Sequence, residues 1–93
     1  MIVEWLPRAH DDLSSQLNWI AERNPWAAID IGDTVIAAVT RLADHPAMGR
    51  AGRVVGTREL VVVGTPFVVV YRLETAAVLI LRVLHGAQMW PRE

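Results

Sequence analysis

Residues 65–86 read TPFVVVYRLETAAVLILRVLHG, and this stretch decides the fold class. Two runs rich in Val, Leu and Ile, at 67–73 and 78–84, are typical of β-strands. The three residues between them are too few for a crossover, so the two strands must pair antiparallel. A similar run at 58–63 ends three residues before Phe67 and extends the predicted antiparallel sheet to a third strand.

The first half of the chain has mainly helical periodicity. Residues 2–6 are a short apolar run that we expect to be a strand, and a helix follows from Pro7 to Arg23 because proline suits the first helical position. Asn24 and Pro25 end this helix and begin a second one. Along the second helix, apolar or small residues follow a 3.6-residue period until His45-Pro46: Ala28, Gly32, Val35, Ile36, Val39, Leu42 and Ala43.

The predicted order is therefore β-α-α-β-β-β, an α+β fold in which a helical hairpin packs on one face of a small antiparallel sheet. Residues 47–56, rich in Gly and Arg, are predicted to be a loop. The strands are apolar on both faces, whereas the hairpin covers one. The second face is then expected to bind a partner or to form a recessed groove. We expect one domain over residues 1–93.

Composition narrows the functional classes. Hydrophobic residues make up 53% of the chain, slightly above the roughly 45–50% of soluble domains, which favours a partner-binding surface over a merely dense core. The chain has no cysteine, so a disulfide scaffold and a thiolate metal site are excluded. Its N-terminus does not resemble a signal or transit peptide and its apolar runs are too short to span a membrane, so we predict a soluble, cytoplasmic protein.

Charge is divided unevenly between the two halves. Residues 1–49 hold three arginines and seven acids, whereas residues 50–93 hold six arginines and three acids. All nine cationic side chains are Arg, which recognises phosphate and carboxylate groups in a bidentate manner. The basic half is expected to face nucleic acid or an acidic protein segment; ordinary surface charge is the alternative.

Three strings in this half carry a family resemblance: GTRELVV (56–62), TPFVVVYRL (65–73) and VLILRVLHGAQMWP (78–91). In this order and spacing they resemble the RelE/ParE superfamily, the toxins of bacterial type II toxin–antitoxin modules, and in particular its ParE-like, plasmid-stabilisation branch. The predicted order of elements agrees over nearly the whole chain. The resemblance implies a cognate antitoxin, whose helical and partly disordered segment wraps the toxin.

The resemblance implies two classes of target. RelE-like members cut mRNA on the ribosome, and ParE-like members bind and poison DNA gyrase. RelE-like ribonucleases are similar in placing an Arg after the aromatic that opens the third strand, where this chain has Val68, and several have a Tyr near the C-terminus, where it has Trp90. Both departures favour the gyrase-binding class. A degenerate module that only binds antitoxin is a third reading.

Several side chains are candidates for either function. His85 has a pKa suited to acid–base work, with Arg58 and Arg82 as cations if the protein is a ribonuclease; otherwise His85 caps a strand end. Arg82 interrupts an apolar run, so it is either paired in the sheet or exposed in the groove. The candidates for binding antitoxin or target are Arg50, Arg53, Arg58, Arg82, Gln88 and Trp90.

Each candidate also has a structural alternative. Arg50, Arg53 or Arg58 would form an ion pair with Glu59 or Glu74, and Trp90 would fold back on the sheet edge. Trp5, Trp19 and Trp26 are expected in the core or the hairpin packing, with Trp26 partly exposed, and His10 and His45 on the surface. The sequence predicts no metal site and no cofactor.

Overall fold

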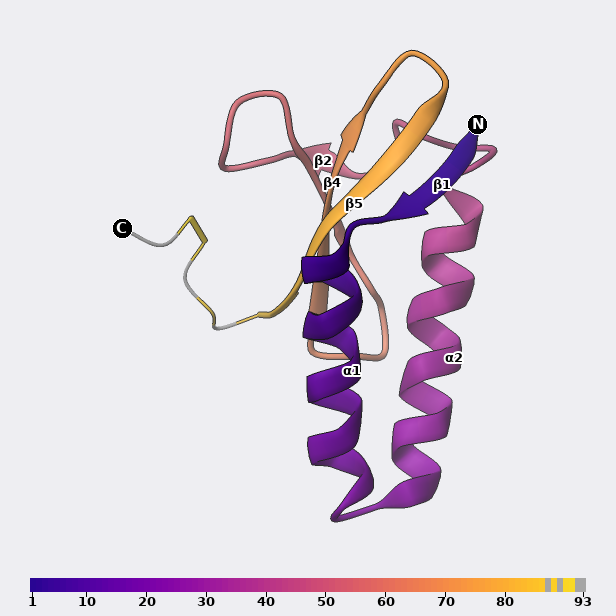
Figure 1. The fold of residues 1–93 in the computed structure, drawn as a ribbon, viewed down its shortest axis with the longest axis vertical. Helices are drawn as coiled ribbons and strands as arrows, with labels where there is room; N and C mark the ends of the chain where they lie inside the picture. The colour runs from indigo at the N-terminus through magenta and orange to yellow at the C-terminus, as the bar shows by residue number, and fades with distance from the viewer. Residues whose placement is uncertain (87, 89, 92–93) are drawn as a thin grey trace.

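The computed structural model describes residues 1–86, 88, 90 and 91. A long helical hairpin packs beside a twisted sheet, and its closed end extends beyond the sheet (Figure 1). The elements in chain order are β1 (Ile2–Trp5), α1 (Pro7–Ala21), α2 (Pro25–Arg41), β2 (Arg50–Ala51), β3 (Arg58–Val61), β4 (Phe67–Leu73) and β5 (Ala77–His85).

The sheet has the strand order β1-β5-β4-β3-β2. Its antiparallel pairs β3–β4 and β4–β5 confirm the prediction for the second half. The prediction of a wholly antiparallel sheet is wrong, because β1 pairs with β5 in parallel, with Ile2 opposite Ala77 and Trp5 opposite Ile80. The two helices and three further strands lie between β1 and β5 in the chain, so the connection is long enough for a parallel pair.

The segment predicted as a loop contains the edge strand β2. Arg50 pairs with Glu59 and Ala51 with Arg58. The Arg58 guanidinium also donates from Nη1 to the carbonyls of Ala47 at 3.3 Å and Gly49 at 2.8 Å. Strand β2 is only two residues long and has no apolar pattern, so no sequence periodicity reveals it.

The boundary between the helices follows the expected capping chemistry. The Asn24 side chain accepts a hydrogen bond from the Ala27 N–H at 3.1 Å, and Pro25 occupies the first turn of α2. The hairpin then packs its apolar stripe on the sheet. The core joins Leu13 of α1 and Val39 of α2 to Phe67, Val69 and Tyr71 of β4.

The tryptophans divide between core and surface. Trp5 packs against the core, as predicted. Trp19 is 59% exposed near the closed end of the hairpin, so the expectation that it packs in the core or the hairpin is wrong. Trp26, which was expected to be partly exposed, is 77% exposed. Trp19 instead carries the Arg23 guanidinium 3.6 Å above its ring centroid. Both rings remain largely exposed, and the Arg23 guanidinium covers one face of the Trp19 ring.

The pairing of β4 with β3 and β5 shows which side chains lie on the sheet face that points away from the hairpin. Val70 pairs with Glu59 on one side and with Arg82 on the other, so these three side chains form one cross-strand row. Val68 and Leu84 lie in the next row. Val68, Val70 and Leu84 are at most 7% exposed, so this apolar face is already covered within the chain rather than left bare for a partner.

Tyr71 fixes the segment that leads from α2 into the sheet. Its buried hydroxyl donates to the Pro46 carbonyl and accepts from the Gly49 N–H, both at 2.8 Å. A Cβ at Gly49 would lie 2.7 Å from the Tyr71 ring, so the chain passes too close for any other residue. The single tyrosine therefore has a structural role.

We predict that Tyr71→Phe destabilises the fold by about 1–3 kcal/mol, because the Gly49 N–H and the Pro46 carbonyl lose a buried partner. Urea unfolding followed by circular dichroism measures the change. Thr34→Val is the control, because it removes a hydroxyl that bonds to a carbonyl of its own helix at an exposed position. Equal stability of the two variants would contradict this role.

Candidate functional site

Two carboxylates, each shared by two arginines, organise the sheet face opposite the hairpin. Glu59 lies at one end of the cross-strand row and is 1% exposed. Its Oε1 accepts from Arg50 at 3.3 Å and Arg53 at 3.2 Å, and its Oε2 accepts from the Arg53 backbone N–H at 2.8 Å. The ion pair expected for this loop is thus present, with Glu59 as the acid.

Burial by itself raises the pKa of Glu59. The Arg53 backbone hydrogen bond, the Arg50 side chain and the Arg53 guanidinium oppose this effect and outweigh it, so the pKa of Glu59 lies below its ordinary value. Glu59 is therefore ionised at neutral pH and holds the two arginines in place.

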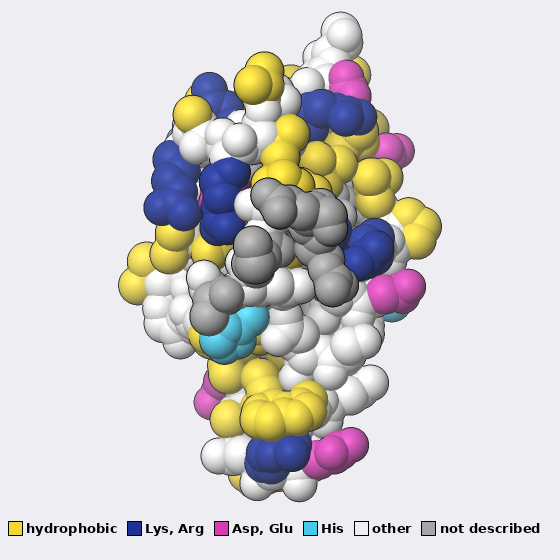
Figure 2. Space-filling model, turned by 90° about the vertical axis from the view of Figure 1, so that its left-hand side faces the viewer, with side chains coloured by type: hydrophobic (Ala, Val, Ile, Leu, Met, Phe, Trp, Pro, Cys, Tyr) yellow, Lys and Arg dark blue, Asp and Glu magenta, His cyan; other side chains and the backbone are white. Residues whose placement is uncertain are grey.

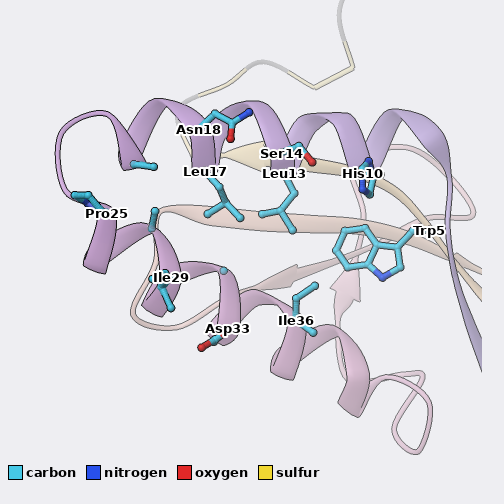
Figure 3. A pocket seen from close by; sticks show the side chains of 13 residues that line it. Trp5, His10, Leu13, Ser14, Leu17, Asn18, Pro25, Ile29, Asp33 and Ile36 are labelled. Carbon is cyan, nitrogen blue, oxygen red and sulfur yellow. The ribbon is translucent and has the colours of Figure 1, made fainter.

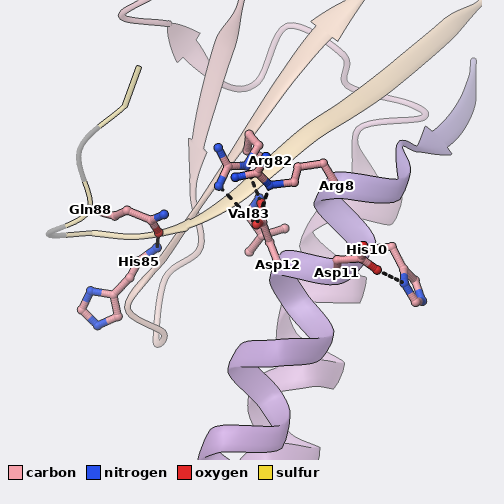
Figure 4. Close-up of polar contacts among 8 residues, drawn as sticks. All are labelled: Arg8, His10, Asp11, Asp12, Arg82, Val83, His85 and Gln88. Atoms are coloured by element: carbon pink, nitrogen blue, oxygen red, sulfur yellow. Dashed lines mark hydrogen bonds and ion pairs between the residues drawn. The ribbon is translucent and has the colours of Figure 1, made fainter. Parts of the chain in front are cut away.

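At the other end of the row, the Asp12 carboxylate is shared by Arg82 and Arg8. Its carboxylate accepts Arg82 Nε at 2.7 Å and Arg82 Nη2 at 3.2 Å, and Arg8 lies 3.7 Å away (Figure 4). The Arg82 side chain is 10% exposed and that of Asp12 is 12% exposed. Arg82 is thus paired, but with α1 rather than within the sheet.

Asp12 also replaces a missing strand. Strand β1 pairs with β5 only along Ala77–Ile80, and beyond that point the chain of β1 has turned into α1. The Val83 N–H, farther along β5, donates to Asp12 Oδ2 at 3.0 Å. One side chain of α1 therefore satisfies both the buried guanidinium and the backbone of β5.

These pairings leave a surplus of positive charge. Four arginines share two carboxylates, and three of the four are well exposed: the side chains of Arg8, Arg50 and Arg53 by 63%, 60% and 41%. Figure 2 shows arginine side chains at several places on one side of the molecule. We call this set, Arg8, Asp12, Arg50, Arg53, Glu59 and Arg82, the arginine face.

Trp90 lies between the two arginine pairs. Its carbonyl accepts from Arg53 Nη1 at 3.5 Å, and the Arg82 guanidinium carbon lies 5.5 Å from its ring centroid. Its indole N–H is buried and has no hydrogen-bond acceptor among the described residues. The expectation was that Trp90 closes the sheet edge, whereas its described contacts are with Arg53 and Arg82. Gln88 is exposed and accepts the His85 backbone N–H at 3.2 Å.

His85 belongs to a different surface. It pairs with Phe67, and their rings meet edge to face with centroids 6.4 Å apart. Its imidazole borders a hollow of about 470 Å³ next to Ser15, Gln16 and Trp19 of α1. Because successive residues of a strand point to opposite faces, His85 and Arg82 project from opposite faces of β5.

The three residues proposed for RNA cleavage do not converge. Arg58 on β3 lies opposite Tyr71 of β4, and His85 on β5 lies opposite Phe67 of β4. The two residues are thus on different neighbours of β4, and their partners are four residues apart along it. Strand geometry places Arg58 and His85 about 16 Å apart. Arg58 is also bound to two loop carbonyls, and Arg82 is held by Asp12.

The hairpin forms a second candidate surface. A groove of about 790 Å³ lies between α1 and α2, with Leu13 and Leu17 on one wall, Ile29 and Ile36 on the other and Trp5 at one end (Figure 3). Ile29 and Ile36 are 54% and 48% exposed. Gly32 lies in this groove, where an added Cβ would be 3.1 Å from Leu17, so glycine keeps the helices close. Polar side chains border it, among them His10, Asn18 and Asp33.

Sequence reasoning missed Asp12 and this groove. The exposed isoleucines are spaced along the helix like the core residues, and they differ from them only in lining the groove between the helices. Asp12 gave no signal, because its partner lies 70 residues away. His10 and His45 are exposed, as predicted.

Comparisons with known proteins agree with this architecture. Residues 3–90 match the family described as the ParE toxin of the type II toxin–antitoxin system, parDE. Y4kP of Sinorhizobium fredii is 38% identical over 90 residues, which cover 97% of this chain and 93% of Y4kP. Toxin RelE1 of Caulobacter vibrioides is 34% identical over 85 residues, which cover 87% of this chain and 88% of RelE1.

A solved chain from the chromosomal ParDE TA system of P. aeruginosa has the same fold. It superposes with a TM-score of 0.83 at 24% identity, covering 91% of this chain and 95% of the other. The protein described here is therefore a toxin-type α+β domain. It belongs to the ParE toxin family of type II toxin–antitoxin systems, which confirms the resemblance found in the sequence.

Two properties of the described residues bear on membranes and metals. None of their helices is long and apolar enough to cross a membrane. No group of three or more His, Cys, Asp or Glu side chains among them is placed to hold a metal ion.

We predict that Asp12→Asn destabilises the protein by about 3–5 kcal/mol, because it leaves the Arg82 charge buried without a counter-ion. Asp11→Asn is the matched control: Asp11 is 76% exposed, and its change should stay within about 0.5 kcal/mol. Adding Arg82→Met to Asp12→Asn should recover part of the loss. Equal effects of the two aspartate variants in denaturant unfolding would refute the structural role of the pair.

Glu59 makes stability depend on pH. Its folded-state pKa is depressed, so its contribution is complete above the ordinary carboxyl pKa and disappears as pH falls through the folded value. We expect unfolding free energy to fall on acidification below about pH 4.5, and less steeply in Glu59→Gln. Glu74→Gln, at a 47% exposed side chain, should keep the wild-type slope. An unchanged slope in Glu59→Gln would contradict this assignment.

Proposed function

We propose that this chain is the growth-inhibiting toxin of a type II module, that it binds and poisons DNA gyrase in the cytoplasm, and that a cognate antitoxin neutralises it. The family membership supports the toxin role. We choose gyrase over the ribosome as the target because Arg58, Arg82 and His85 lie apart, on two faces of the sheet. A binding protein needs no convergent acid, base and cation, whereas a ribonuclease does.

RNA cleavage requires a base at the ribose hydroxyl and cations at the reacting phosphate, all within a few ångströms. Arg82 is engaged by both oxygens of Asp12, and His85 borders α1 on the opposite face. This arrangement supports the gyrase-binding class. The name RelE1 of the Caulobacter relative keeps a ribosome-dependent endoribonuclease as the alternative.

The target is tested by expressing the chain without its partner. We expect inhibited supercoiling and gyrase-dependent DNA breaks, with no mRNA cutting, and His85→Ala should retain this toxicity. Rapid translation-dependent mRNA cleavage that His85→Ala abolishes would overturn the proposal in favour of the ribonuclease. A folded protein without effect on growth, gyrase or mRNA would favour a degenerate module that only binds antitoxin.

The groove between the helices fits the antitoxin. An amphipathic helix recognises such a groove by inserting apolar side chains spaced three or four residues apart. The exposed Ile29 and Ile36 offer the apolar wall, and Asn18 and Asp33 border it with polar groups. A segment that folds on binding would cover the surface that the sheet leaves bare.

We predict that Ile29→Glu weakens antitoxin binding by at least about tenfold, because it buries an unpaired carboxylate in the groove. Toxicity without antitoxin should remain. Val63→Glu is the matched control, since Val63 is 87% exposed and lies outside the groove. Calorimetric titration of the purified antitoxin measures both; equal affinities would place the antitoxin elsewhere.

A further inference from the structure

A hollow between α1 and one end of the sheet takes no part in the proposed function. It measures about 470 Å³, and residues of three segments line it: Ser15, Gln16, Trp19 and Ile20 of α1, Pro66 and Phe67 around the start of β4, and His85 at the end of β5. We call it the His85 hollow. The groove proposed for the antitoxin uses other residues of α1: Leu13, Ser14, Leu17, Asn18 and Ala21. The two surfaces therefore lie on different sides of this helix.

Three aromatic rings form much of the wall. Phe67 is 1% exposed and meets the His85 ring edge to face, and Figure 4 shows the imidazole pointing away from Arg82. The Trp19 ring is largely exposed, and the Arg23 guanidinium that covers one of its faces is not part of the hollow. The side of the indole that lines the hollow is thus available. Exposed aromatic rings of this kind bind planar heterocycles by stacking.

Hydrogen-bonding groups lie beside the rings. Ser15 is exposed and Gln16 half-buried, and neither side chain forms a hydrogen bond to another described residue. A glutamine amide both donates and accepts, so it can pair with a ring that carries a donor beside an acceptor, as adenine does. No carboxylate is among the described residues that line the hollow, so an anionic ligand meets no like charge there.

Contacts outside the hollow hold its walls in place. The Gly86 N–H donates to the Pro66 carbonyl at 2.7 Å and ties the end of β5 to the turn before β4. The Thr65 hydroxyl accepts the Phe67 N–H at 3.1 Å within that turn. Asp12 fixes α1 on β5. A ligand therefore meets walls that are already ordered, which lowers the entropic cost of binding.

The size and the lining together indicate the class of ligand. About 470 Å³ lies within the roughly 300–1,000 Å³ of small-molecule sites, which combine apolar walls with a few polar groups. An aliphatic side chain of a partner protein would use the apolar walls and leave the Gln16 amide without a partner. A heteroaromatic ring uses both, so it fits the hollow better.

We propose that the His85 hollow binds a free purine nucleotide, whose base stacks on the Trp19 ring and pairs along its edge with Gln16. A mononucleotide fits better than a nucleic-acid strand. The chain has a net charge of -1, and residues 1–49, which include α1, hold seven acids and three arginines, so a long phosphate backbone would be repelled. This inference goes beyond the proposed function and does not depend on gyrase being the target.

The test is a titration of isotopically labelled protein with adenosine monophosphate, followed by the NMR signals of the tryptophan indole N–H groups. We expect a saturable shift of the Trp19 signal, whereas the signal of Trp26, exposed on the same hairpin, stays in place. This readout uses the unchanged chain, so it does not depend on the folding of any variant. Supercoiling inhibition is measured separately, so failure of the nucleotide site and failure of the proposed target are distinguishable.

Variants test the two contacts with the base. Trp19→Ala should weaken binding at least about fivefold, because the stacking surface is lost, and Trp19→Phe should retain it. Gln16→Leu keeps the apolar bulk and should also weaken binding about fivefold, because the ring edge loses its amide partner. Trp26→Ala is the matched control and should bind like the unchanged chain.

Related ligands separate the base from the rest of the nucleotide. Adenosine should still shift the Trp19 signal, since it keeps the base, and ribose phosphate should not. An equal shift with ribose phosphate would overturn the proposal and identify an anion site, and the absence of any saturable Trp19 shift would overturn it outright. Tighter binding of a short single-stranded DNA, or of a short tryptophan-containing peptide, would overturn it in favour of a nucleic-acid or a protein surface.

Discussion

The contact between Asp12 and β5 is the constraint on which the rest of the structure depends. Strand β1 leaves the sheet after Trp5, and the Asp12 carboxylate takes its place beside Arg82 and Val83. Because the pair is nearly buried, the cost of desolvating both charges is offset only by this bidentate geometry and the backbone hydrogen bond. The contact fixes how α1 lies on the sheet, and with it the position of the whole hairpin.

At the other end of the cross-strand row, Glu59 is a second buried charge that is stabilised by arginines. It holds Arg50 and Arg53 over β3 and keeps their guanidinium groups at the surface. Sharing one acid between two arginines satisfies the buried carboxylate and still leaves a positive charge for an external anion. The same side chains can therefore stabilise the loop and recognise a partner.

The two candidate surfaces lie on different parts of the fold. The hairpin groove, with Ile29 and Ile36, is apolar, and the arginine face is charged. An antitoxin helix in the groove and an acidic segment on the arginine face would not compete for the same side chains.

The sequence by itself determined the α+β class and the bounds of the helices and main strands within a few residues, because apolar periodicity, proline positions and short connections are local properties. The ParE family entered as a resemblance, carried by three strings in the second half of the chain. Only the tertiary structure decided the parallel β1–β5 pair, strand β2, the pairing of Arg82 with Asp12 and the exposure of Trp19. These features join residues far apart in the chain, and no local pattern encodes which distant groups meet. Arg82 is an example: its position in an apolar run indicated that it needs a partner, but only the fold showed that this partner is Asp12.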